Sequence, residues 1–384
     1  MHEAVFEVQD IFREYGSQYI AKYNPPPHIC KVIRAIAQCR TATLGVHIDF
    51  CDCGFTRQSY NSCRNRHCPK CQALVKEKWI LDRESELLPV PYFHIVFSLP
   101  SDLDIITMHN KAEIYNLLFK ASAETLKELA HDPKYLGANI GFTSILHTWG
   151  QTLTLHPHIH MIVLGGGLTA CSQWRSCGKD FFLPVKVMSR KFRGKFLAYL
   201  KQAKLESEGS QEYQSDLFQL DNIIDSLYRK DWYVYCKRPF NTTRSVLEYL
   251  GRYTHRIAVS NHRIMRFENG LVTFSYRDYK SDNKQKAMTL PALEFMRRFL
   301  LHVLPTGFTK IRHYGMFGNA TKSEKLALCA KLLNFIMLTK TVLSTAELIL
   351  KITGEDISIC PNCGKVLQST REMARASPNI KSCA

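Results

Sequence analysis

The spacing of apolar residues divides the chain into helical and strand-like segments. It predicts a weakly amphipathic segment over residues 1–23 and helices over 72–88, 109–130, 186–204, 243–256 and 291–303. Alternating or continuous apolar runs predict strands over 92–100, 141–149, 152–164 and 232–240, and a hairpin over 262–276. We expect Gly165-Gly166-Gly167 to end the third strand and the polar stretch 206–216 to form a surface loop. Helices and strands interleave without a strict βαβ period, which favours an α+β fold with an antiparallel sheet.

Length and charge narrow the class of protein. The 384 residues suggest two or three domains, at roughly 150 residues each. Because 45% of the residues are hydrophobic, the chain can bury a sizeable core and is not a disordered basic tail. The 51 Lys and Arg exceed the 34 Asp and Glu, a net charge of +17 that favours a nucleic-acid partner. Basic residues concentrate in 186–204 and 229–266, where the phosphates of such a partner are expected to bind. We expect a cytoplasmic protein with no membrane partner, since neither a signal peptide nor a membrane-length apolar run is visible.

The cysteines cluster near the start of the chain. Seven of the 14 fall within residues 30–71, and Cys68 and Cys71 have the two-residue spacing of a zinc knuckle. Thiolate and imidazole sets of this kind select Zn²⁺. The alternative, free cysteines buried in a core, is less consistent with such density. The candidate ligands of a structural zinc site are Cys39, Cys51, Cys53, Cys63, His67, Cys68 and Cys71, with His47 also in range. The spacing allows either one ion or two.

Two weaker signals accompany this cysteine-rich segment. The interleaved basic residues, Arg64 and Arg66 among them, predict contacts with phosphates, although basic residues beside zinc knuckles are often only solvated surface. Cys360 and Cys363 could begin a second zinc knuckle near the C-terminus. Only Cys383 follows them as an obvious further ligand.

A second candidate metal site lies on the strand that contains His156, His158 and His160. Residues two apart on a strand share a face, so His158 and His160 can bind one cation. A single histidine there would more often be a core or surface residue, but three at alternate positions favour a metal site. Gln151 is the best placed third ligand. His147, His94 and His156 are the alternatives.

Tyr249 and Tyr253 lie four residues apart and share one face of the predicted helix 243–256. Tyrosines at this spacing are usually core residues. Here Arg244, Arg252 and Arg256 surround them, and residues 229–266 contain nine Lys or Arg against two acids. Phosphate is therefore an expected neighbour, and a phenolate can act as a nucleophile on a phosphodiester.

Several motifs together carry a family resemblance over residues 28–335. They are CRTATLG (39–45), NSCRNRHCPKCQ (61–72), YFHIVFSLP (92–100), HTWGQTLTLHPHIHMIVLGGGL (147–168), YLGRYTHRIAVSNHRI (249–264), FMRRFLLHVLP (295–305) and IRHYGMFGN (311–319). In type and order they resemble the rolling-circle transposases of insertion sequences. These enzymes form the two-tyrosine branch of the His-hydrophobic-His (HUH) endonuclease superfamily.

The resemblance implies a function and roles for individual residues. His158 and His160 would bind a catalytic Mg²⁺ or Mn²⁺, with Gln151 as a polar third ligand. Tyr249 and Tyr253 would be the two nucleophiles, each able to attack single-stranded DNA and leave a 5′-phosphotyrosine bond and a free 3′-hydroxyl. The DNA partners would be the transposon ends and the target, and the bacterial protein would be nucleoid-associated.

The resemblance also implies a domain order. A helix and zinc-binding DNA-recognition domain (1–88) would precede an antiparallel-sheet HUH catalytic domain flanked by helices (89–305) and a helical C-terminal region (306–384). In one departure from the family, a single residue separates Cys51 from Cys53 where two are usual. The alternatives are a plasmid or phage replication initiator, a conjugative relaxase, and a non-catalytic zinc-dependent DNA-binding regulator.

Overall fold

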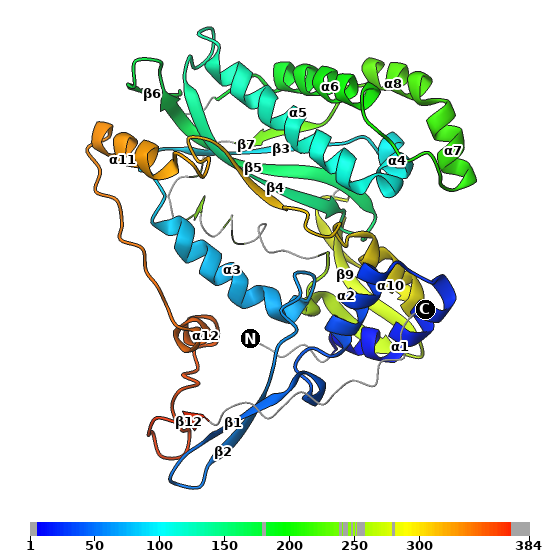
Figure 1. Cartoon of the computed structure of the whole chain (residues 1–384), viewed down its shortest axis with the longest axis vertical. Helices are drawn as coiled ribbons and strands as arrows, with labels where there is room; N and C mark the ends of the chain where they lie inside the picture. Colours follow the sequence, from blue (N-terminus) through cyan, green and yellow to red (C-terminus); the bar gives the residue numbers. More distant parts are fainter. Residues whose placement is uncertain are drawn as a thin grey trace.

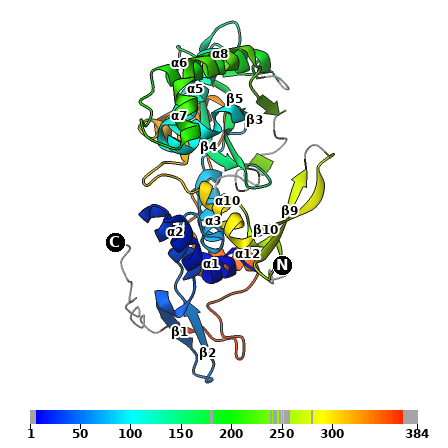
Figure 2. The ribbon, with the colours of Figure 1, turned by 90° about the vertical axis from the view of Figure 1, so that its right-hand side faces the viewer.

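The computed structural model describes residues 6–178, 182–237, 240, 245, 246, 249, 251, 258–278 and 281–369. This part of the chain forms a helix-covered six-stranded sheet, a second core of helices with a three-stranded ribbon, and a small cysteine-rich hairpin (Figure 1). Figure 2 shows these parts following one another along the long axis, with the sheet at one end and the hairpin at the other. The expected α+β class is confirmed. Among the described helices, none has the length and apolar character needed to cross a bilayer.

The six-stranded sheet is antiparallel, with strand order β11-β4-β5-β3-β7 and β6 paired to β5. Its strands are β3 (Tyr92–Ser98), β4 (Asn139–Trp149), β5 (Leu155–Leu168), β6 (Trp174–Ser176), β7 (Val234–Lys237) and β11 (Ile311–Gly315). The predicted hairpin across Gly150 is present as β4 and β5. The prediction that the three glycines end this strand is wrong, because β5 continues through them to Leu168 and pairs there with β6.

One face of this sheet is covered by α5 (Lys111–His131) and α6 (Val185–Lys201), as Figure 1 shows. Odd-numbered residues of β5, such as Ile159 and Met161, join the core beneath these helices. Three shorter helices extend this layer: α4 (Asp104–His109), α7 (Gln211–Phe218) and α8 (Leu220–Arg229). The loop predicted at 206–216 is present only over 206–210, and the rest of that stretch belongs to α7. Ser210 caps α7 by accepting a hydrogen bond from the Tyr213 backbone N–H, and the Tyr213 side chain is fully buried.

Part of the positive charge of α6 is neutralised within the protein. Lys191 forms an ion pair with Glu128 at 2.8 Å, and Lys195 pairs with Glu128 at 2.6 Å and with Glu124 at 3.4 Å, both acids lying on α5. These two lysines therefore link α6 to α5, so part of the positive charge in 186–204 is paired within the protein.

The opposite face of the sheet carries the even-numbered residues of β5. Ile162 and Leu164 pack there against α11 (Lys322–Leu332), Val246 and Tyr249. His158 and His160 belong to the same set of alternate positions, so they face away from α5 and α6. This face therefore positions the candidate catalytic residues.

A second core joins the two ends of the sequence. Its helices are α1 (Val8–Tyr23), α2 (Pro27–Ala37) and α10 (Ala292–Leu301), and its ribbon consists of β8 (Ile264–Glu268), β9 (Leu271–Asp278) and β10 (Lys284–Pro291). Residues 292, 295, 296, 299 and 300 form a buried stripe on α10, and Phe299 meets Phe12 of α1 at a ring distance of 5.2 Å. Residues 258–303 were expected in the catalytic domain. In the structure, apolar side chains from the described part of this segment pack against α1 and α2.

The cysteine-rich hairpin consists of β1 (Val46–Phe50) and β2 (Thr56–Tyr60), with β12 (Gln368–Ser369) paired to β1. It is followed by α3 (Pro69–Glu84), which runs toward the six-stranded sheet (Figure 1). On α3, Asp82 pairs with Lys340 at 2.8 Å and Glu77 with Lys351 of α12 (Thr345–Thr353) at 4.0 Å. The C-terminal segment therefore lies along α3 and ends at the hairpin.

Candidate active site and metal centres

Three groups of side chains in the described residues bring their ligand atoms within 4.8 Å of one another, as metal coordination requires. The groups are His147, His158 and His160; Cys39, Cys63, Cys68 and Cys71; and Cys51, Cys53, Cys360 and Cys363.

The three histidines come from two neighbouring strands. His158 and His160 are on β5, and His147 lies directly opposite His158 on β4. The Nε2 atoms of His158 and His160 are 3.1 Å apart. His147 and His160 are only 2% and 7% exposed, while His158 is half-buried and opens toward a cavity. Strand pairing thus fixes all three rings on the face that Tyr249 also occupies.

His147 joins His158 and His160 in this group, whereas Gln151 was the preferred third ligand. Gln151 lines the same cavity of about 230 Å³, but its Oε1 accepts a hydrogen bond from the Arg277 backbone N–H at 3.5 Å. Its own carbonyl accepts a hydrogen bond from Arg263. The register of β4 and β5 supports His147 as a candidate third ligand, because it places this buried histidine directly opposite His158.

Tyr249 approaches the histidine group through His94 of β3. Its hydroxyl lies 2.8 Å from both ring nitrogens of His94. His94 Nε2 is 2.9 Å from Nδ1 of His160, and these two rings are stacked with centroids 5.1 Å apart. A continuous set of contacts therefore connects the phenol to the metal-ligand group, and His94 is its central member. His94 was predicted only as an alternative metal ligand.

Burial keeps two of these imidazoles neutral. Desolvation lowers the pKa of His158 to about 3, with His156 adding a smaller effect in the same direction. Desolvation also lowers the pKa of His94 to about 3, assisted by Lys237. A neutral ring has a free lone pair, which is the form that binds a metal ion.

The segment that contains Tyr249 and Gly251 lies against α3, the helix that follows the cysteine-rich hairpin. Tyr249 and Gly251 are both helical, and Gly251 is buried. A Cβ added to Gly251 would lie 2.4 Å from Ile80 Cδ1 and 3.1 Å from Lys76 Cε on α3. The glycine therefore permits a close approach between this segment and α3. The other predicted residues of the segment, Tyr253, Arg244, Arg252 and Arg256, lie outside the described residues.

The first cysteine group is embedded in the second core. Sγ of Cys71 lies 3.6 Å from Sγ of both Cys39 and Cys63, and Cys39, Cys68 and Cys71 are buried. Hydrogen bonds with neighbouring thiols, that with Cys39 first, lower the pKa of Cys71. A cluster in which one sulfur readily becomes a thiolate suits Zn²⁺.

The other predicted zinc ligands do not lie in this first cysteine group. The spacing had left open whether Cys51 and Cys53 share an ion with Cys68 and Cys71. In the structure they lie with Cys360 and Cys363. The expected partner of the C-terminal pair, Cys383, is outside the described residues.

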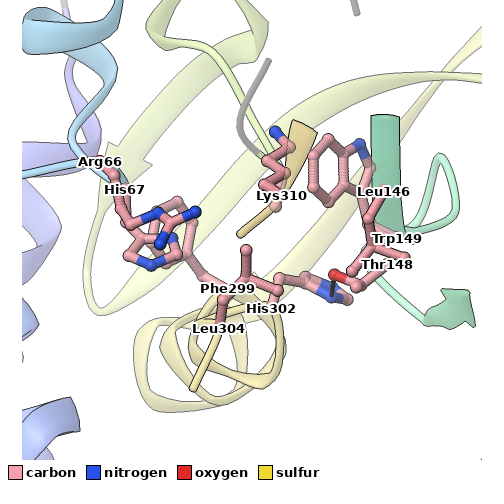
Figure 3. A pocket seen from close by; sticks show the side chains of 10 residues that line it. Arg66, His67, Leu146, Thr148, Trp149, Phe299, His302, Leu304 and Lys310 are labelled. Atoms are coloured by element: carbon pink, nitrogen blue, oxygen red, sulfur yellow. Dashed lines mark hydrogen bonds between the residues drawn. The ribbon is translucent and has the colours of Figure 1, made fainter. Parts of the chain in front are cut away.

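His67 belongs to neither cysteine group. Figure 3 shows it beside Arg66 in a small cavity of about 20 Å³ that Lys310 and His302 also line. Desolvation, then the charge of Arg66, lowers the pKa of His67 to about 3. Arg64 and Arg66 are both exposed, and Arg66 also donates an Nη1 hydrogen bond to the carbonyl of Phe308 at 2.8 Å. Of the two arginines predicted to contact phosphate, Arg66 therefore also has an internal structural role.

Comparison with known proteins identifies the family. Residues 141–325 match the family model described as "Putative transposase", and residues 11–99 match the "Transposase zinc-binding domain". "Putative transposase y4qJ" of Sinorhizobium fredii (strain NBRC 101917 / NGR234) is 45% identical over 93% of this chain and 92% of its own. The transposase for insertion sequence element IS801 of Pseudomonas savastanoi pv. phaseolicola is 26% identical over 77% of this chain and 72% of its own.

Among solved structures, the conjugative relaxase TrwC in complex with oriT DNA covers 64% of this chain and 73% of its own. Its identity is 12% and its TM-score 0.26, values too low to support a functional argument. The sequence similarities alone are decisive: this chain belongs to the transposase family of these relatives and carries its zinc-binding domain.

Proposed function

We propose that this transposase acts as an HUH-type endonuclease and strand transferase of a rolling-circle insertion sequence. Tyr249 would be a nucleophile, and His147, His158 and His160 would bind the catalytic metal ion. The observation that carries the proposal is the contact of the Tyr249 hydroxyl with His94, which in turn contacts His160. A candidate nucleophile and a candidate metal site thus meet on one face of the sheet.

The histidine group fits one divalent ion. Two nitrogen ligands about 2.1 Å from an ion and at right angles to each other are about 3.0 Å apart. The 3.1 Å between the Nε2 atoms of His158 and His160 agrees with this geometry. Mg²⁺ prefers oxygen ligands, so this nitrogen-rich set favours Mn²⁺ over Mg²⁺. When bound, the ion would polarise the scissile phosphate and stabilise the charge of the transition state.

Cleavage by Tyr249 conserves the energy of the phosphodiester. The phenol oxygen would form a bond to phosphorus and lose its proton, while the bond between phosphorus and the 3′ oxygen breaks and that oxygen leaves as a hydroxyl. The resulting 5′-phosphotyrosine bond can be reversed by another 3′-hydroxyl, so no high-energy cofactor is needed. The family motif makes Tyr253 the second nucleophile, which would accept the next strand transfer.

The cavity beside the histidines has the chemistry expected of a single-strand site. Trp149, Tyr233 and Tyr235 line it together with Arg263. Tyr233 and Tyr235 are 63% and 42% exposed, so their rings are available to stack on bases. The substrates would be single-stranded DNA from the ends of the element and its target, which agrees with the relative that serves an insertion sequence.

A structural zinc ion would sit apart from this chemistry. Cys39, Cys63, Cys68 and Cys71 would bind it within the core formed by α1, α2 and α10. The exposed Arg64, next to Cys63, would contact DNA phosphates as this domain recognises the ends of the element.

The direct test is covalent capture of DNA. Full-length protein is incubated with Mn²⁺ and labelled single strands from the ends of the element, and the adduct is resolved on a denaturing gel. We expect a metal-dependent adduct that the combined Tyr249→Phe and Tyr253→Phe variant cannot form. The single variants report which tyrosine cleaves first. If wild-type protein binds the strand but never forms an adduct, or the double variant still does, the proposal fails.

Matched histidine variants test the metal site. His147→Ala and the pair His158→Ala and His160→Ala should each abolish adduct formation while leaving the zinc content unchanged. His156→Ala is the control: this side chain is exposed, and its backbone carbonyl makes the hydrogen bond to His158. Gln151→Ala discriminates between the two candidate third ligands, because it should retain Mn²⁺ affinity if His147 is the ligand.

A further inference from the structure

A second group of four cysteines is assembled from opposite ends of the chain. Cys51 and Cys53 follow β1, while Cys360 and Cys363 come after α12. The Sγ atoms of Cys53 and Cys360 are 3.5 Å apart across 307 residues of sequence, and those of Cys51 and Cys363 are 3.4 Å apart. Of these four cysteines, only Cys51 and Cys53 lie within residues 11–99, the region that matches the zinc-binding domain.

The geometry of the four thiols fits a tetrahedral zinc ion. Sulfur ligands about 2.3 Å from zinc in a tetrahedron are about 3.8 Å apart, close to the separations found here. Each pair also lies in a turn that ends at a glycine. The N–H of Gly54 donates to the Cys51 carbonyl three residues earlier, and the N–H of Gly364 donates to the Cys360 carbonyl four residues earlier, both at 2.9 Å. The two turns differ in length, but both glycines have positive φ angles, +89° and +74°, which glycine adopts readily.

Contacts outside the sulfurs hold the same two segments together. β12 pairs with β1 through Asp49 opposite Ser369 and Phe50 opposite Gln368. Arg57 of β2 forms an ion pair with Asp49 at 2.6 Å and donates a hydrogen bond to the carbonyl of Ile357 at 2.5 Å. The approach of the two cysteine pairs is therefore part of a formed interface that includes strand pairing and a partly buried ion pair.

We propose that Cys51, Cys53, Cys360 and Cys363 bind a second structural zinc ion, which joins the C-terminal segment to the zinc-binding domain. The single residue between Cys51 and Cys53 is compatible with this role, since the C-terminal pair supplies a two-residue knuckle opposite it. Cys53 and Cys363 are exposed, whereas Cys39, Cys68 and Cys71 of the first group are buried. The second ion is therefore the more accessible of the two and leaves first when a chelator is added.

Zinc content tests the proposal without reference to DNA cleavage. Elemental analysis of the full-length protein should give two zinc ions per chain, and the double variant Cys360→Ser and Cys363→Ser should retain one. A matched double variant, Cys171→Ser and Cys236→Ser, changes two cysteines outside both groups and should retain two. Equal zinc content in wild type and in the Cys360 and Cys363 variant would overturn the proposal.

A second measurement uses wild-type protein, so its result does not depend on whether the variant folds. A coloured chelator should withdraw zinc in two steps of one equivalent each. Digestion after the first step should cut the exposed linker around Ile336 and Val342 and release residues 345–369 from the hairpin. Release of only one equivalent in total, or a first step that leaves this segment as protected as before, would contradict the second site.

Discussion

The close approach of Gly251 to Ile80 provides a test of whether α3 positions the nucleophile. The perturbation is Gly251→Ala. Its new Cβ would lie 2.4 Å from Ile80 Cδ1, more than 1 Å inside the optimal carbon–carbon separation of about 3.5–4.0 Å. Overpacking of this kind lowers the free energy of unfolding by about 1–3 kcal/mol, while replacing glycine by alanine in a helix raises it by about 1 kcal/mol. We therefore expect a net loss of stability of about 0–2 kcal/mol.

The double-mutant cycle isolates the contact from these separate effects. Ile80→Ala removes the atom that would clash. Because Ile80 is half-buried, this substitution should lower the free energy of unfolding by less than the cost of about 2–5 kcal/mol for a fully buried isoleucine. In the double variant the loss should be smaller than the sum of the single losses by about 1–2 kcal/mol. Urea unfolding of zinc-loaded protein measures all four free energies.

The functional readout is single-turnover formation of the DNA adduct. Displacing a reacting group by about 1 Å can cost about a hundredfold in rate, so Gly251→Ala alone should slow the reaction by about ten- to a hundredfold. Ile80→Ala in the same chain should restore most of the rate. Two results together would refute the idea that α3 sets the position of Tyr249. The stability loss of the double variant would equal the sum of the single losses within about 0.5 kcal/mol, and Ile80→Ala would fail to restore the rate.

Three further predictions concern the histidine face and its surroundings. His94→Ala should weaken Mn²⁺ binding by about 10–100-fold in calorimetric titration, because it removes the group that orients His160; unchanged affinity would exclude that role. Tyr233→Ala should lower the affinity for single-stranded DNA by about 1–3 kcal/mol, whereas Tyr228→Ala, equally an exposed tyrosine but on α8, should not. Arg263→Ala should reduce the slope of log affinity against log salt by about 0.7, while Lys195→Ala, whose ammonium pairs with two carboxylates, should leave it unchanged.

Local pattern was enough to predict much of the site. Strand alternation placed His158 and His160 on one face of β5, and the turn at Gly150 predicted the β4–β5 hairpin that brings His147 opposite. The family motifs then singled out Tyr249, whose hydroxyl lies beside His94 on the same face, while its role as a nucleophile remains a proposal. These features depend on residues close in sequence, where periodicity and turn chemistry determine the geometry.

Partners distant in sequence could not be found in this way. Nothing in the spacing of Cys51 and Cys53 indicates that Cys360 and Cys363 lie beside them, because their meeting depends on how β12 pairs with β1. Charge was similarly misleading on α6, where Lys195 is basic in sequence but paired with α5 in the fold. The position of His147 opposite His158, which supports it as an alternative to Gln151, depends on the register of β4 and β5.

The sequence separation of 307 residues from Cys53 to Cys360 also has a consequence for biosynthesis. At about 5–20 residues per second, a ribosome needs roughly 15–60 s to add them. During that time the β1–β2 hairpin exists with only two of the four thiols, while Cys39, Cys63, Cys68 and Cys71 have all been translated. A copy of the gene shortened at its 3′ end would keep the histidine face and the first cysteine group but would remain in this half-formed state. Completion of the second cysteine group therefore marks a chain that has been translated through Cys363.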